Sequence, residues 1–125
     1  MARIELTLPR EREFSAVADL VLAGIASRLD VTLEAIDDLQ LALESLLERD
    51  EADGATLTVC FDVEDGEIRA SIGPFERSEI EPELAAVGVG AGIGLRRVLD
   101  STVDEVELTE RDGGCWVDLR KAVGR

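Results

Sequence analysis

Apolar and polar residues alternate at the start of the chain and then change to a longer period. Every second residue from Ile4 to Leu8 is apolar, which predicts a half-buried strand over 3–8 that ends at Pro9. From Glu11 onward, apolar residues recur every three or four positions, as the core-facing side of a helix requires. The members of this stripe are Phe14, Val17, Val21, Ile25 and Leu29.

A second helix is predicted after Thr32, because the hydroxyl of that residue can cap the first turn. Glu34 places a negative charge in the same turn, where it complements the helix dipole. Asp53 and Gly54 are expected to end the helix. Its apolar stripe consists of Ile36, Leu39, Leu43, Leu46 and Leu47.

The rest of the chain predicts shorter elements. In order, they are a strand over 56–63, a turn at 64–66, a strand over 68–72, a surface loop over 73–89, a short helix over 95–100, a strand over 103–108, a turn at 111–114 and a strand over 116–119. This order predicts an α+β fold, a two-layer helix–sheet sandwich with a mixed, mostly antiparallel sheet. One domain is expected over residues 1–125, with 122–125 as a short tail.

Composition limits the classes of partner that the chain can bind. The 13 basic and 28 acidic residues give a net charge of −15. Such acidity repels phosphate backbones and anionic lipid, so we expect no nucleic acid and no membrane as partners, and favour a protein with a basic patch. Acidity can equally serve only to keep a protein soluble. No apolar run is long enough to span a membrane and no signal peptide is evident, so a cytoplasmic location is expected.

Composition also excludes several kinds of catalytic and metal site. The chain has no His, which excludes an imidazole base and a His-ligated zinc site, and it has no Asn. Cys60 and Cys115 are too few for a disulfide framework or a four-thiolate metal site. Both lie in strand-like apolar surroundings, so buried reduced thiols are expected.

A glycine-rich segment is the one phosphate-like signal. Gly90, Gly92 and Gly94 would let backbone amides approach an anion, at the N-terminus of the helix that follows. The spacing is not that of a dinucleotide-binding fingerprint. A flexible joint between loop and helix explains these glycines equally well.

The second predicted helix carries polar residues within its apolar pattern. Glu44 and Glu48 are four residues apart, as are Ser45 and Arg49. A carboxylate beside a phosphate site could act as a base or a metal ligand. The alternative is an ordinary solvated helix face.

Several stretches of the chain also carry a resemblance to a known family. They are Leu22–Asp30 (LAGIASRLD), Ile36–Leu43 (IDDLQLAL), Gly92–Leu95 (GIGL), Val98–Asp100 (VLD) and Val103–Val106 (VDEV). They resemble the N-terminal half, the glycine box and the following strand of bacterial anti-sigma-factor serine kinases of the RsbW type, and the resemblance spans roughly Ile4 to Lys121. That family belongs to the ATPase superfamily of histidine kinases, gyrase and the heat-shock chaperone. The resemblance therefore implies a histidine-kinase-like (Bergerat) sandwich.

The resemblance also implies a nucleotide site, from which this sequence departs. The kinases carry a Glu base on the second helix and, one turn later, an Asn that holds Mg²⁺ against the ATP phosphates. An ungapped alignment places Ser45 and Arg49 at these positions, whereas a shift by one residue places Glu44 at the base and Glu48 at the Asn. Neither alignment supplies the Asn. Arg49 could neutralise phosphates without metal or could plug the pocket by pairing with a carboxylate.

A second family motif is also altered. Members carry an Asp before a Gly to accept the adenine amino group, and here Ser71 and Gly73 stand in those places. The segment 74–89 is shorter than the family's ATP lid. The chain is therefore interpreted as a degenerate member, with vestigial nucleotide positions at Arg49, Ser71, Gly73, Gly90, Gly92 and Gly94.

Three functions follow from this interpretation. The first is a non-catalytic regulator in a sigma-factor partner-switching pathway, which binds a sigma factor or an anti-sigma antagonist. The second is a residual ATP-dependent serine kinase that uses Glu44. The third is a structural subunit of a heterodimer. No cofactor is expected, with ATP and Mg²⁺ only in the second case. The family commonly forms homodimers, so a homodimer through the first strand and helix is expected, with a monomer as the alternative.

Overall fold

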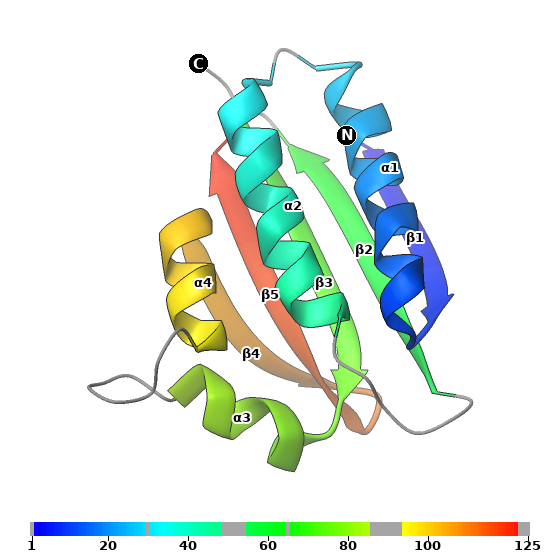
Figure 1. Cartoon of the computed structure of the whole chain (residues 1–125), viewed down its shortest axis with the longest axis vertical. Coiled ribbons are helices and arrows are strands. Elements are labelled where there is room, and N and C mark those ends of the chain that lie inside the picture. The colour runs from blue at the N-terminus through cyan, green and yellow to red at the C-terminus, as the bar shows by residue number, and fades with distance from the viewer. Residues whose placement is uncertain (1, 30, 49–54, 65, 86–93, 123–125) are drawn as a thin grey trace.

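The computed structural model describes residues 2–29, 31–48, 55–64, 66–85 and 94–122. Five strands form one sheet in the order β1-β2-β3-β5-β4, and the helices cover one of its faces (Figure 1). The strands are β1 (Ala2–Pro9), β2 (Thr56–Glu64), β3 (Glu67–Phe75), β4 (Glu105–Arg111) and β5 (Gly114–Ala122). The helices are the 3-10 turn η1 (Arg12–Phe14), α1 (Ser15–Ala26), α2 (Leu33–Leu47), α3 (Arg77–Ala85) and α4 (Leu95–Thr102).

The expected two-layer α+β sandwich is confirmed. All four strand pairings among the described residues are antiparallel, so the sheet is antiparallel throughout rather than mixed. The predicted hairpin turns are supported by positive φ angles at Gly66, Asp112 and Gly113 (76°, 50° and 79°), a region that glycine and Asp tolerate. β5 continues through Ala122, one residue into the expected tail.

The core lies between the sheet and α2, which occupies the middle of the helix layer between α1 and α4 (Figure 1). Thr32 caps α2 as predicted, since its Oγ1 accepts a hydrogen bond of 3.1 Å from the Ala35 amide. Most of the predicted apolar stripe of α2 is buried, with only Ile36 partly exposed. The strand residues that meet it without solvent exposure include Val59, Phe61, Ile68, Ile72 and Val117.

The predicted stripe of the first helix is partly wrong. α1 begins at Ser15 rather than near Glu11, and its buried residues are Ser15, Ala18, Leu22, Ile25 and Ala26. Val17 and Leu29 are more than a third exposed. Because nearly every residue of this helix is apolar, more than one stripe fits the same period, and only packing against the sheet selects among them.

The loop predicted over 73–89 is also wrong where the structure describes it. β3 extends to Phe75, and α3 follows with Ile80 and Leu84 buried one turn apart. The helix was missed because it has few apolar residues and contains Pro82, which cannot donate a backbone hydrogen bond.

A buried ion pair attaches α3 to the rest of the fold. The Arg10 guanidinium, just beyond β1, bonds both carboxylate oxygens of Glu79 on α3. It also lies 5.2 Å from the centre of the Phe75 ring. Arg10 and Glu79 are 5% and 15% exposed at their side chains, so the pair is largely withdrawn from water. Long-range contacts of this kind are invisible to sequence periodicity.

Two smaller expectations can be compared with the structure. Cys60 and Cys115 are both buried and unbridged, as predicted. Within the part of the chain that the structure describes, no helix is long and apolar enough to cross a membrane.

Candidate functional site

The two flanks of α2 face different neighbours, and this decides which of its polar residues share a site. Gln40 donates a hydrogen bond of 3.4 Å to the Asp19 carbonyl of α1, and Glu48 accepts one of 2.8 Å from the Ser15 hydroxyl of α1. Glu44 lies between Gln40 and Glu48 at four-residue spacing, so all three follow the same flank. That flank of α2 therefore faces α1.

The opposite flank of α2 faces β5 and α4. Asp38 accepts a hydrogen bond of 3.1 Å from the Lys121 ammonium of β5, the strand beneath that side of the layer (Figure 1). Ser45 follows Asp38 by seven residues, which is nearly two full turns, and so lies on the same flank. The C-terminal end of α2 and the N-terminal end of α4 lie at the same end of the layer (Figure 1).

The two alignments that the sequence left open therefore place the family's base position on different flanks of α2. Ser45 occupies the flank that faces α4, whereas Glu44 faces α1. The Ser45 hydroxyl donates a hydrogen bond of 2.7 Å to the Ala42 carbonyl of its own helix. Arg49 lies outside the described residues, so both hypotheses for its guanidinium stay predictions.

An acidic cluster lies between α1 and α2, and sequence reasoning missed its centre. Burial raises the pKa of Asp19 from 3.8 to about 7, helped by a hydrogen bond with Glu44 and by the negative charges of Glu44 and Glu48. Two carboxyl groups can bond each other only when one holds a proton. Glu44 is thus engaged with Asp19, whose Oδ1 atom is buried with no hydrogen-bond partner among the described residues. The one signal in the sequence was that Asp19 is the sole charged residue of α1.

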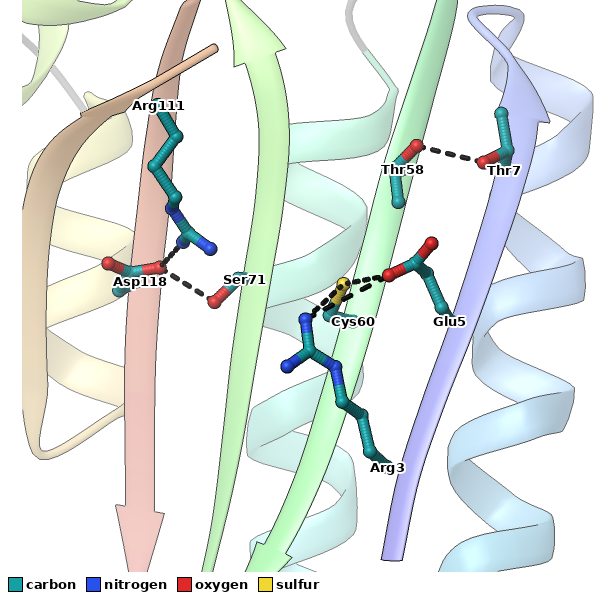
Figure 2. A network of polar contacts seen from close by, with 8 residues as sticks. All are labelled: Arg3, Glu5, Thr7, Thr58, Cys60, Ser71, Arg111 and Asp118. Atoms are coloured by element: carbon teal, nitrogen blue, oxygen red, sulfur yellow. Dashed lines mark hydrogen bonds and ion pairs between the residues drawn. The ribbon is translucent and has the colours of Figure 1, made fainter.

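Ser71 does not lie with the residues of α2 and α4. Its neighbours Ala70 and Ile72 are buried under the helices, so by strand alternation Ser71 points to the opposite, helix-free face. Figure 2 shows its hydroxyl directed at Asp118, to which it donates a hydrogen bond of 2.7 Å. Ser71 therefore lies on the face opposite α2, and its assignment as a vestigial nucleotide position stays a prediction.

Gly73 has a packing explanation on that same face. A Cβ atom at this position would lie 2.7 Å from the Trp116 ring and 2.9 Å from the Cys115 carbonyl. A close approach of the indole to the backbone thus accounts for the glycine without any ligand.

The glycine-rich segment is only partly described. Gly90 and Gly92 lie outside the described residues. Gly94 precedes the first turn of α4 with an extended backbone (φ −88°, ψ 168°), and a Cβ atom there would meet nothing within 4 Å. The backbone at Gly94 therefore does not require glycine.

The helix-free face is a network of polar side chains (Figure 2). Asp118 accepts hydrogen bonds from Ser71, Thr109 and Arg111, and the Arg111 guanidinium stacks 4.8 Å from the centre of the Trp116 ring. Ser71, Arg111 and Asp118 border a depression of about 500 Å³ that is lined by both arginines and carboxylates. The arginines of this face are paired with carboxylates, whereas Asp62 and Glu107 have no ion-pair partner among the described residues.

A second part of this network surrounds Cys60 on β2. Figure 2 shows its sulfur between Arg3 and Glu5 of β1, at 3.9 Å and 3.4 Å. Burial, followed by the hydrogen bond to Glu5, raises the pKa of the Cys60 thiol. The thiol therefore stays protonated at neutral pH.

No metal site is evident in the described ranges. They contain no group of three or more Cys, Asp or Glu side chains arranged to hold a metal ion, and the chain has no His.

Comparison with known proteins places the chain in a family. No model of a protein family matches it. The serine-protein kinase RsbW of Oceanobacillus iheyensis is 33% identical over 124 residues, which covers 96% of this chain and 73% of that protein. RsbW of Listeria monocytogenes serotype 4b is 30% identical over 133 residues, covering 89% and 82%, and RsbW of Halalkalibacterium halodurans is 25% identical over 142 residues, covering 98% and 84%.

A solved structure agrees on the fold. The crystal structure of the RsbU and RsbW domains of Rv1364c from Mycobacterium tuberculosis superposes with a TM-score of 0.70 at 14% identity. The match spans the whole of this chain and 33% of that one. The fold is therefore the histidine-kinase-like ATPase sandwich that the sequence resemblance implies. Together with the identities over most of both chains, these matches show that the chain belongs to the RsbW family of anti-sigma-factor serine-protein kinases.

Proposed function

We propose that this chain is a regulator in a sigma-factor partner-switching pathway that acts by binding proteins and has lost most of the kinase nucleotide site. The orientation of α2 carries this proposal. On the flank that faces α4, the residue at the family's base position is Ser45, whose hydroxyl bonds its own helix. The nearest alternative base, Glu44, lies on the flank that faces α1.

The chemistry of these side chains does not suit phosphoryl transfer. A general base needs a proton-accepting group near the operating pH and within reach of the substrate hydroxyl. A serine hydroxyl ionises far too weakly for this purpose. Glu44 lies on the flank that faces α1 and would have to leave it to reach a substrate on the other side of the helix.

The residues present do not fit Mg-ATP either. Mg²⁺ prefers oxygen ligands in strict octahedral geometry, and the family supplies one from an Asn side chain. The chain contains no Asn, and its one Gln, Gln40, bonds α1 on the wrong flank of α2. Ser71, which stands where the family has its adenine-binding Asp, faces the other side of the sheet.

The proposed partner is a protein with a basic patch, either a sigma factor or an anti-sigma antagonist. The net charge of −15 favours such a partner through long-range attraction. Relatives named as RsbW kinases support this class of partner, because partner switching is the family's established setting. A cytoplasmic location would follow from this function.

A homodimer is proposed through β1 and α1. β1 is an edge strand of the described sheet, and an apolar groove of about 340 Å³ beside it is lined by residues such as Ile4, Val21 and Leu29. Light scattering should give twice the chain mass of 13.5 kDa at tens of micromolar protein, and Ile4→Asp should lower it. A mass of 13.5 kDa for the unmodified chain would contradict the homodimer.

The experiment that tests the proposed function combines binding with phosphate transfer. The chain is mixed with candidate sigma factors and antagonists and resolved by size exclusion, with and without Mg-ATP. We expect a complex that forms without nucleotide and no phosphoserine on the antagonist. Stoichiometric, Mg²⁺-dependent phosphoserine would contradict the proposal and would establish the residual kinase instead.

A further inference from the structure

The most exposed large apolar residues of the described chain lie on the outer side of the helix layer. Leu20 of α1 is 72% exposed, and Leu33 and Leu41 of α2 are 74% and 51% exposed. Every other large apolar residue in the described ranges is 38% exposed or less. Burial of apolar surface is favourable, so these three leucines leave apolar surface that a partner could cover.

These leucines lie close together. Leu33, Asp37 and Leu41 follow one another at four-residue spacing and form a single stripe along α2. The hydrogen bond from Gln40 to the Asp19 carbonyl shows that α1 and α2 are at the same level there, so Leu20 and Leu41, each the next residue of its helix, lie at about that level too. We define the acidic leucine face as Leu20, Leu33, Glu34, Asp37 and Leu41, all of which are exposed.

The charges around this face are not neutralised. Neither α1 nor α2 contains a Lys or Arg. Among the described residues, Glu34 and Asp37 have no ion-pair partner, in contrast to the paired carboxylates of the helix-free face. The two faces of the molecule therefore differ. One carries arginines that pair with its carboxylates, and the other presents apolar side chains among acids with no Lys or Arg on the same two helices.

We propose that the acidic leucine face docks a basic amphipathic helix of a protein partner. The leucines would cover the apolar stripe of that helix, and Glu34 and Asp37 would pair with Lys or Arg on its borders. A second copy of this chain is a poor occupant, because it would bring the same negative charges together, and anionic lipid is repelled for the same reason. This inference rests on the proposed function and specifies the surface and the class of partner segment.

The geometry also sets the size of the segment. Leu33 and Leu41 are eight residues apart, which corresponds to about 12 Å along α2. A helix of two to three turns spans this distance. Its apolar residues are expected at positions i, i+3 or i+4, and i+7, with basic residues on both sides.

The probe is a designed fluorescent peptide of about 18 residues, with leucines at helical spacing and lysines on both borders. Its control has the same composition in an order that has no helical apolar stripe. Binding to the full chain is measured by fluorescence anisotropy at about 0.15 M salt, where non-specific attraction is screened. We expect the amphipathic peptide to bind at least about tenfold more tightly than the control peptide.

Two variants test the face itself. Asp37→Lys should weaken binding of the amphipathic peptide at least about fivefold, whereas Glu107→Lys, the same charge change on exposed β4 of the helix-free face, should change it less than about twofold. The double variant Leu20→Gln, Leu41→Gln should weaken it at least about tenfold. Both leucines are exposed, so folding of this variant is checked by circular dichroism and should be unchanged.

Several outcomes would overturn the inference. Equal binding of the two peptides, equal losses from Asp37→Lys and Glu107→Lys, or unchanged binding after both leucine substitutions would each show a general charge effect. If these results occur while the chain still binds a sigma factor or antagonist and fails to bind Mg-ATP, the docking face is wrong and the proposed function stands. If the chain binds Mg-ATP and the peptide and variants behave as expected, the docking face is correct and the proposed function is wrong.

Discussion

Replacement of Asp19 by Asn should stabilise the protein, and the gain should depend on pH. Asp19 faces Glu44 and Glu48 across the interface between α1 and α2, and its pKa is raised to about 7, first by burial and then by Glu44. Asparagine has nearly the same shape and carries no charge. It can also donate a hydrogen bond to Glu44 at any pH.

The direction of the pH dependence follows from proton binding in the folded and unfolded states. The folded protein holds the proton of Asp19 up to about pH 7, whereas the unfolded chain releases it near pH 3.8. The free energy of unfolding therefore falls as pH rises between these values and is lowest above pH 7. A pKa held at about 7 instead of 3.8 corresponds to at most about 4 kcal/mol. Asp19 remains partly exposed, so water screens the repulsion and we expect about 1–2 kcal/mol.

The assay is urea unfolding followed by the fluorescence of Trp116, the single tryptophan, at about pH 5, 6.5 and 8. The gain in unfolding free energy from Asp19→Asn should be about a third of its full size at the lowest pH and reach about 1–2 kcal/mol at the highest. Asp37→Asn, on an exposed carboxylate of α2, is the matched control and should show no such slope. An equal gain at every pH, or a loss at the highest pH, would show that the charge on Asp19 does not destabilise the fold.

Two further substitutions test the fold. Arg10→Ala should lower the unfolding free energy by about 3 kcal/mol in urea, because it leaves the buried Glu79 carboxylate without its guanidinium; a loss below about 1 kcal/mol would contradict this. Gly73→Ala should cost about 1–3 kcal/mol by forcing a Cβ atom against Trp116, whereas Gly94→Ala, where nothing lies within 4 Å, should change stability by less than about 0.5 kcal/mol. Equal effects at the two glycines would contradict the packing explanation.

Sequence periodicity predicted those elements whose polar residues mark one side clearly. α2 is such a case, because Thr32 caps it and its buried apolar residues form a single stripe that is separated by polar residues. α1 is nearly all apolar, so its orientation depended on contact with the sheet. α3 has two buried apolar residues and depends on the ion pair between Arg10 and Glu79, which are distant in the sequence.

The candidate site was predicted less completely than the fold. The sequence left Ser45 and Glu44 as alternatives, because the ungapped alignment gives Ser45 and a shift of one residue gives a carboxylate at the base position. The structure distinguishes them because one residue of helix corresponds to a rotation of about 100°, which turns Glu44 toward Asp19 and α1. The position of Ser71 was available from the sequence, since alternation with Ala70 and Ile72 already directs it away from the core.

Isothermal titration of the chain with Mg-ATP measures whether the nucleotide site is lost. Loss of the Mg²⁺ ligand and of the adenine carboxylate should each cost about 1–3 kcal/mol, or together a factor of about 30 to 10⁴ in affinity. We predict no saturable binding up to about 1 mM Mg-ATP. A dissociation constant below about 100 μM for Mg-ATP, with no binding of GTP, would show that the chain retains a nucleotide site.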